Sequence, residues 1–301
     1  MRNKALTGGA VVLIIIGLVV VFCLWAGEKI NDKITENNPN ISKPAPDNNE
    51  NPLAPPTASS EAEKVYLALG NPSNASSSPS NADNYLMVNN IYALSYNRDK
   101  GIPNWVAWRL TASDFGSANR QNDFRPDERL PQNWTHVMPN DYTHSGYDRG
   151  HLCPSADRSN SEESNSETFL MTNMTPQTHA LNAGPWEKLE TYSRSMVRRD
   201  TTLYIIAGQY GEKEKLKNKV SVPTNFWKII VVLPANGNVS AINANTRIIA
   251  VDMPNDEYVA NENWRKYRTT VKNIEQKTGY NFLSNIPDNL RNMLKSKIDT
   301  Q

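Results

Sequence analysis

Residues 148–154 read Asp-Arg-Gly-His-Leu-Cys-Pro, and this stretch determines how the rest of the chain is interpreted. If the stretch is extended, Arg149 and His151 project from the same side of it. Histidine is the side chain best able to accept a proton near neutral pH. Arginine offers fixed, permanently charged donors that suit a phosphate. Gly150 between them permits close approach of backbone or substrate, although an isolated histidine is more often structural.

A second informative stretch follows about thirty residues later, where residues 182–190 read Asn-Ala-Gly-Pro-Trp-Glu-Lys-Leu-Glu. A helix that opens at Pro185 puts Asn182 at its start and Trp186 and Glu190 one turn apart on one face. The asparagine carbonyl is a good ligand for Mg²⁺, and Glu190 can hold one of the water molecules that this ion keeps. The alternative makes Asn182 a helix cap, Trp186 part of the core and Glu190 a solvated residue.

Hydrophobic periodicity outside these stretches predicts an α+β domain with a mixed or antiparallel β-sheet core. Runs rich in Tyr, Ile, Val and Trp predict strands at 85–88, 91–97, 104–111, 169–173, 203–208, 226–233 and 247–251. Helices are expected around 61–69, from Pro185 onward, over 264–277 before Gly279, and after Pro287.

The N-terminal segment has a composition of its own. Residues 10–25 are apolar throughout and follow Arg2 and Lys4, which predicts a transmembrane signal-anchor over 1–27 with an exported remainder. Residues 28–60 are rich in Asn, Pro, Ser and Asp, and we expect a disordered linker there. The catalytic domain then spans 61–301 and is extracytoplasmic, either periplasmic or extracellular. The alternative is a cleaved signal peptide and a secreted protein.

Net charge and cysteine content restrict the possible functions less than the motifs do. The formal net charge is +1, so binding to a polyanion must rely on local clusters of Arg and Lys. Arg194, Arg198 and Arg199 form either such a cluster or a solvated helical face. Cys23 lies in the apolar run, so no disulfide to Cys153 is predicted, and Cys153 is interpreted as a packing residue.

The remaining histidines show no pattern that suggests chemistry. His136, His144 and His179 are too scattered in the sequence for a zinc cluster. We therefore expect them to be structural or exposed to solvent, as we expect the tryptophans of the domain to pack in its core.

Taken together, the ordered motifs resemble the DNA/RNA non-specific endonuclease family with its ββα-metal site. The resemblance rests on residues 148–151, on Thr-Asn-Met-Thr-Pro-Gln at 172–177, and on Asn182, Trp186 and Glu190. It continues through residues 104–108, 225–228, 268–271 and 278–279, and covers roughly 85–297.

Under this resemblance, His151 matches the general base that activates water. Asn182 matches the single protein ligand of a divalent metal, and Glu190 matches the carboxylate that orients the water shell of the metal. Asn173 matches a polar residue that supports the site.

The same resemblance places Arg149 near the phosphate and makes Arg120 the upstream arginine that stabilises the transition state. Arg125 and Arg129 lie close to Arg120 in the sequence, so the register of that arginine is open.

The implied activity is metal-dependent hydrolysis of DNA and RNA with little sequence specificity, with Mg²⁺ or Mn²⁺ as cofactor. One alternative is an anchored protein that captures nucleic acid without cutting it. Another is a phosphodiesterase for small substrates. The sequence leaves open the biological role, the oligomeric state and whether an inhibitor protein exists.

Overall fold

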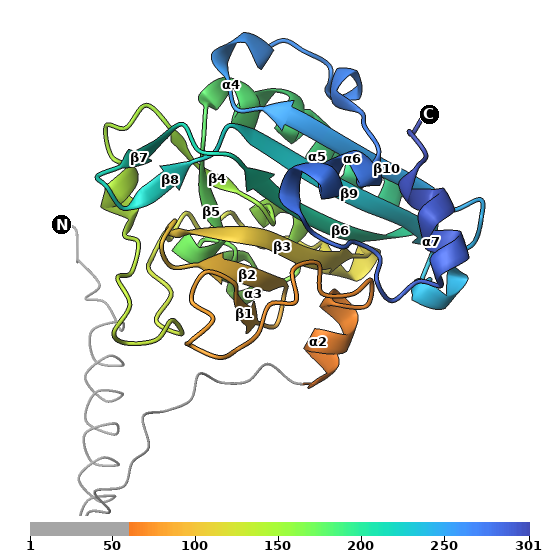
Figure 1. The fold of residues 1–301 in the computed structure, drawn as a ribbon, viewed down its shortest axis with the longest axis horizontal. Helices are drawn as coiled ribbons and strands as arrows, with labels where there is room; N and C mark the ends of the chain where they lie inside the picture. The colour runs from red at the N-terminus through yellow and green to blue at the C-terminus, as the bar shows by residue number, and fades with distance from the viewer. Residues whose placement is uncertain (1–59) are drawn as a thin grey trace, which may run out of the picture. The chain divides into compact units, whose positions relative to one another are not determined.

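A six-stranded antiparallel sheet organises residues 60–301, the part of the chain that this computed structural model describes (Figure 1). Every neighbouring pair of strands is antiparallel, so the predicted antiparallel core is confirmed. In spatial order the strands are β1 (Tyr85–Val88), β2 (Ala93–Asn97), β3 (Ile102–Leu110), β6 (Thr201–Tyr210), β9 (Asn225–Pro234) and β10 (Arg247–Pro254).

Two short β-ribbons and several helices complete the fold. The ribbons pair β4 (Asp148–His151) with β5 (Met174–Gln177), and β7 (Glu214–Leu216) with β8 (Val220–Val222). The α-helices are α2 (Ser60–Tyr66), α3 (Glu162–Glu167), α4 (His179–Leu181), α5 (Glu187–Val197), α6 (Val271–Thr278) and α7 (Asp288–Lys295). A π-helical turn, Asn182–Trp186, joins α4 to α5. Short 3₁₀ turns include Ala112–Asp114, Pro139–Tyr142, Ser155–Asp157, Met171–Asn173, Val239–Ala241, Glu257–Val259 and Trp264–Tyr267.

Both faces of the central sheet are covered, which gives three layers. On β9, Phe226 and Ile230 belong to one hydrophobic core and Trp227 and Ile229 to another, as the alternation of a strand requires. Helix α5 packs into the first core and helices α6 and α7 into the second. Figure 1 shows α6 and α7 on the near side of the sheet and α5 behind it. The sheet therefore separates α5 from the two C-terminal helices.

One predicted strand, Phe169–Asn173, is wrong. Residues 171–173 form a 3₁₀ turn, and the strand begins only at Met174. The buried side chain of Asn173 explains the difference, because its amide donates to the carbonyls of Cys153 and Thr168. Such bonds from an asparagine side chain to the backbone favour a turn over a strand.

The helix predicted over 264–277 is interrupted. Residues 264–267 form a 3₁₀ turn, and α6 begins after Thr270, whose hydroxyl accepts from the amide of Asn273 as an N-cap. The predicted end is correct, because Gly279 adopts a left-handed conformation with φ of 73° directly after α6.

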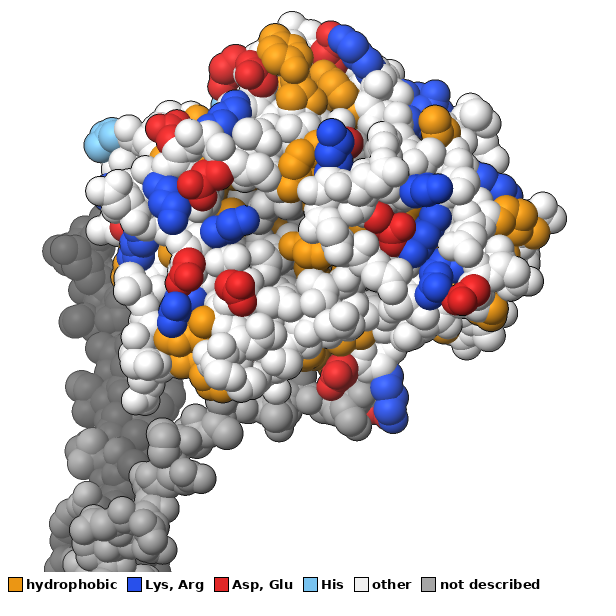
Figure 2. Space-filling view, in the orientation of Figure 1, with side chains coloured by type: hydrophobic (Ala, Val, Ile, Leu, Met, Phe, Trp, Pro, Cys, Tyr) orange, Lys and Arg blue, Asp and Glu red, His pale blue; other side chains and the backbone are white. Residues whose placement is uncertain are grey.

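The predicted signal-anchor, 1–27, lies outside the described residues, and so does the predicted linker, 28–60, except for Ser60, the first residue of α2. Within residues 60–301, no helix has the length and apolar character needed to cross a bilayer. On the face shown in Figure 2, basic and acidic side chains are interspersed.

Candidate active site

The β4–β5 ribbon places Arg149 and His151 on the same side, as predicted for an extended chain. Both side chains line a surface cavity of about 340 Å³. Gly150 faces the opposite side and pairs with Thr175. A Cβ atom at Gly150 would collide with the amide of Gln177, so only glycine fits under that side chain.

His151 is 9% exposed and is held between aromatic rings. Its ring centroid lies 4.9 Å from that of Phe169 and 5.7 Å from that of Phe124. The Nε2 atom is enclosed and has no hydrogen-bond partner within residues 60–301, which leaves Nδ1 as the ring nitrogen available to the cavity. Burial, reinforced by Arg120 and Arg149, lowers the pKa of His151 to about 3. The imidazole is therefore neutral at physiological pH.

Of the three candidate upstream arginines, Arg120 is the one that lines the cavity. Its guanidinium lies 4.8 Å from the ring centroid of Phe169 and donates to the hydroxyl of Ser155. Partial burial lowers the pKa of Arg120. Arg125 and Arg129 instead form ion pairs of 2.7 Å with aspartates of their own loops. Arg125 and Arg129 do not line the cavity.

Arg149 is positioned by stacking rather than by an ion pair. Its guanidinium carbon lies 4.2 Å from the ring centroid of Phe124. Within residues 60–301 its guanidinium forms no hydrogen bond, so its donors are free to meet an anion in the cavity.

Asn182 opens the π-helical turn and also lines the cavity. Its Nδ2 donates to Oδ2 of Asp148 over 2.9 Å, and no donor in residues 60–301 bonds its Oδ1. The same carboxylate oxygen lies 2.9 Å from Nδ1 of His179. The side chain of His179 is 79% exposed, in agreement with the expectation that this histidine is structural or exposed to solvent. Asp148 fixes the amide of Asn182 so that its carbonyl oxygen is the free end.

Glu190 lies on α5 with a side chain that is 11% exposed, so the alternative of a solvated residue is wrong. Its Oε1 is 3.2 Å from Nζ of Lys228, which is itself 1% exposed and lies 4.0 Å from the ring centroid of Trp186. Burial raises the pKa of Glu190, and the charge of Lys228 opposes that rise. Sequence reasoning missed Lys228, although a lysine within the apolar run 226–233 is itself a signal.

Arg194 is the third arginine of the cavity wall, whereas Arg198 and Arg199 do not line it. Nη1 of Arg194 donates to Oδ1 of Asp157 over 3.2 Å. The other oxygen of Asp157 accepts from Nε1 of Trp108 over 3.1 Å. Burial raises the pKa of Asp157 despite its cationic neighbours. The predicted three-arginine patch is thus reduced to one member at the site.

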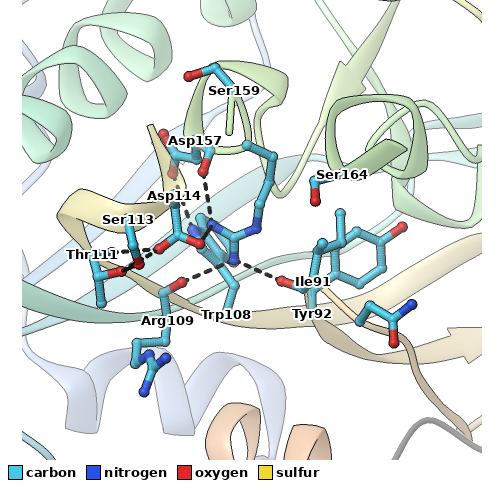
Figure 3. A network of polar contacts seen from close by, with 12 residues as sticks. Ile91, Tyr92, Trp108, Arg109, Thr111, Ser113, Asp114, Asp157, Ser159 and Ser164 are labelled. Carbon is cyan, nitrogen blue, oxygen red and sulfur yellow. Dashed lines mark hydrogen bonds and ion pairs between the residues drawn. The ribbon is translucent and has the colours of Figure 1, made fainter. Parts of the chain in front are cut away.

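Beneath this wall, buried Arg158 ties several loops to the sheet. Its guanidinium donates to the carbonyls of Ile91 and Arg109 over 2.7 and 2.9 Å, and it lies 3.5 Å from Asp114 (Figure 3). These contacts fix the 3₁₀ turn Ser155–Asp157, which carries Ser155 to the cavity and Asp157 against Arg194.

Asn173 is fully buried and does not line the cavity. Its Oδ1 accepts from the amide of Cys153, and its Nδ2 donates to the carbonyl of Cys153. It therefore positions the chain that follows His151. Cys153 is buried and free, and burial raises the pKa of its thiol, which confirms it as a packing residue.

Within residues 60–301, no group of three or more His, Cys, Asp or Glu side chains can hold a metal ion. The residues of the cavity instead offer one free amide oxygen, on Asn182, and the carboxylates of Glu187 and Glu190. This donor set fits a hard divalent ion that keeps most of its water ligands.

A neutral histidine among three arginines, beside an oxygen donor for a metal, defines a phosphodiester hydrolase. Residues 69–289 match the model of the DNA/RNA non-specific endonuclease family, and the chain belongs to that family. The resemblance inferred from the sequence is thereby confirmed. Nucleases of this family depend on a metal.

Known relatives support this assignment. The chain is 51% identical over 249 residues to a nuclease of Nostoc sp. (strain PCC 7120), covering 82% of this chain and 90% of that protein. It is 30% identical over 211 residues to human mitochondrial endonuclease G, covering 65% and 68%. A chain in the crystal structure of the EndoG/EndoGI complex shares the fold, with a TM-score of 0.64, 24% identity, and coverage of 77% of this chain and 95% of that chain.

Proposed function

We propose that this protein is an endonuclease that hydrolyses both DNA and RNA with little sequence preference, using His151 as its general base. The observation that carries the proposal is the position of a neutral His151 between Arg120 and Arg149, in the same cavity as Asn182. Family membership alone does not identify the metal, the general base or the range of substrates. We propose these three features from the residues described below.

His151 begins the reaction by accepting a proton from water through Nδ1. Its lowered pKa in the free enzyme keeps it unprotonated. A phosphodiester bound beside Arg120 and Arg149 brings negative charge that offsets theirs, and this raises the basicity of the imidazole. His151 is therefore a stronger base in the substrate complex than in the free protein.

Arg120 and Arg149 stabilise the negative charge that grows on the phosphate oxygens. Both guanidinium groups are stacked on phenyl rings, so they are preorganised and need little reordering during the reaction. Arg194, held by Asp157, adds a third positive charge to the same wall.

Asn182 is the residue that would hold the metal, for which we propose Mg²⁺ or Mn²⁺, through its free Oδ1. Glu190 lies on the same wall and is placed to orient water around the ion. When bound, the metal supplies Lewis-acid stabilisation of charge on the phosphate and on the leaving oxygen. Asp148 contributes by keeping the Asn182 amide in the orientation that exposes Oδ1.

The broad specificity follows from the chemistry of the wall. Arg120, Arg149 and Arg194 suit phosphate oxygens rather than base edges, and phosphate contacts carry no sequence information. The ligands we propose are accordingly DNA and RNA as polymers.

The test is digestion of plasmid DNA and of RNA by the full-length chain, with Mg²⁺ or with chelator, for wild type and His151→Ala. We expect wild type to cut both polymers with metal and the variant to lose about 10²- to 10⁴-fold in rate. A folded wild type that binds DNA without cutting it would support the capture protein instead. Cleavage of small phosphodiesters alone would support the alternative of a phosphodiesterase for small substrates.

We further propose that residues 1–27 anchor the enzyme in a membrane and that residues 28–60 tether the extracytoplasmic catalytic domain, 61–301. The apolar run 10–25 after Arg2 and Lys4 supports this location. Cell fractionation with protease protection tests it. Mature enzyme in the medium would favour secretion after cleavage, and enzyme free in the cytoplasm would contradict both.

A further inference from the structure

A second cavity, of about 390 Å³, lies on the other flank of α5 from the candidate active site. Helix α5 forms one wall with Lys188, Thr191 and Tyr192, and the 3₁₀ turn Trp264–Tyr267 forms the other wall with Trp264 and Arg265. Two of these residues are cationic, and none of the residues that line the cavity is acidic.

Arg265 is fixed in place while its donors stay free. Its guanidinium carbon lies 4.3 Å from the ring centroid of Trp264 and 4.8 Å from that of Tyr192. The hydroxyl of Tyr192 accepts from Arg247 over 3.0 Å, so the supporting ring is itself held. Within residues 60–301 the guanidinium of Arg265 forms no hydrogen bond or ion pair. A stacked guanidinium keeps its N–H groups available at its edge.

This arrangement repeats the construction of the candidate active site. There, Arg149 lies 4.2 Å from the ring centroid of Phe124 and Arg120 lies 4.8 Å from that of Phe169. In both cavities an arginine guanidinium lies over aromatic rings, and Arg149 and Arg265 alike lack an anionic partner among the described residues. Such a group suits an incoming phosphate.

The neighbouring charges leave this cavity positive. Glu262, the acidic residue nearest to Arg265 in the sequence, forms a 2.7 Å ion pair with Lys266, and Glu187, next to Lys188, lies 3.8 Å from Arg194. Lys188 donates to the backbone carbonyl of Glu262 over 3.3 Å. Trp264 is only 3% exposed, so it supports Arg265 and does not offer a face for a base to stack on. The cavity therefore suits a backbone phosphate and not a nucleobase.

Thr191 joins the two cavities. Its hydroxyl donates to Glu187 and accepts from Nη2 of Arg194 over 2.8 Å, and both of these partners line the candidate active site. One helix thus separates the sites, with a width of about 10–12 Å including side chains. The backbone of one strand crosses this width in a few nucleotide steps.

We propose that Arg265 and Lys188 form a second phosphate subsite, which holds the backbone of the same nucleic acid a few nucleotides from the cleaved bond. This inference rests on the proposed nuclease function and extends it to substrate length. The subsite adds affinity for polymers without reading their sequence, and a substrate too short to cross α5 does not use it.

The test compares Arg265→Gln and Lys188→Gln with wild type on long duplex DNA and on a dinucleotide. Lys272→Gln is the matched control, because it removes the same charge from an exposed residue of α6 that does not line the cavity and forms no ion pair within residues 60–301. For each subsite variant we expect KM for long DNA to rise about tenfold, the loss of one hydrogen bond to a charged group, while kcat stays unchanged. Activity on the dinucleotide should equal that of wild type.

Binding of labelled DNA in chelator, measured against salt, gives a second reading that does not depend on cleavage. The slope of log K against log salt should fall by about one for Arg265→Gln and stay unchanged for Arg265→Lys, which keeps the charge. An unchanged KM for long DNA and an unchanged salt slope in Arg265→Gln would contradict the proposed subsite. A loss of activity on the dinucleotide equal to that on long DNA would contradict it as well. A wild type that cuts neither substrate would count against the proposed function instead.

Discussion

The ammonium nitrogen of Lys228 lies 3.2 Å from Oε1 of Glu190, and both side chains are almost completely enclosed beside the cavity. Lys228 comes from strand β9 of the six-stranded sheet and Glu190 from α5, so this ion pair joins the sheet to the helix that lines the site. Without its partner, the buried carboxylate would be desolvated and uncompensated. The lysine therefore favours the ionised form of Glu190 and holds its carboxylate in position.

Replacing Lys228 by methionine should raise the pKa of Glu190 further, because burial already raises it and Lys228 opposes that rise. The carboxylate is lost as pH falls through its pKa. The acid limb of kcat/KM should therefore move to higher pH in Lys228→Met, and it should return toward the wild-type position in Lys228→Arg. Superimposable pH profiles for wild type and Lys228→Met would contradict this positioning role.

The lowered pKa of His151, about 3 against an ordinary 6.5, makes stability depend on pH. Between these values the unfolded chain binds a proton that the folded protein does not. Stability contributed by neutral His151 is thus fully present above pH 6.5 and is lost as pH falls toward 3. Tm measured against pH should fall less steeply for His151→Asn than for wild type in this window. Equal slopes would show that His151 is not held neutral.

Removal of the Asp148 carboxylate should weaken metal activation. In Asp148→Ala the amide of Asn182 loses its 2.9 Å hydrogen bond and is free to rotate. Loss of a partner that orients a metal ligand typically costs about 10- to 100-fold in metal affinity or activity. The Mg²⁺ concentration for half-maximal activity should rise accordingly. His179→Ala, which removes the other partner of the same carboxylate, is the control and should change this value far less.

Asn173→Ala should lower the free energy of unfolding as well as the catalytic rate. The substitution leaves the amide and carbonyl of Cys153 and the carbonyl of Thr168 without their side-chain partners in a buried region. Each unsatisfied buried group costs about 1–3 kcal/mol. Denaturant unfolding should show that the free energy of unfolding falls by at least about 2 kcal/mol. Substitution of a surface residue would change it by no more than about 0.5 kcal/mol.

The sheet was predictable because its strands are dense in β-branched and aromatic residues that are buried on both faces. Strand β1 matches its predicted bounds, and β6, β9 and β10 differ from theirs only at the ends. The error at Phe169–Asn173 arose because long-range bonds of the Asn173 side chain override the local preference of the run. The short ribbon β7–β8 has only three residues in each strand, too few for a periodic signal.

The site was predictable as a set of residues but not as a network. Ordered motifs indicated His151, Arg149, Asn182 and Glu190, and the structure brings all of them to one cavity. Their supporting partners come from distant positions, because Lys228 lies 38 residues from Glu190. Asp148 likewise lies 34 residues from Asn182. A single sequence has no local pattern that pairs such positions.

The sheet between α5 and the C-terminal helices has a practical consequence for attaching this enzyme to a support. Met293 on α7 is 39% exposed, on the side of the sheet away from the cavity. Cys153 is buried, so a cysteine introduced at position 293 of a chain that begins after residue 59 would be the accessible thiol. An enzyme coupled to a bead through that thiol would present its cavity to the liquid, ready to clear nucleic acid from a flowing sample and be reused.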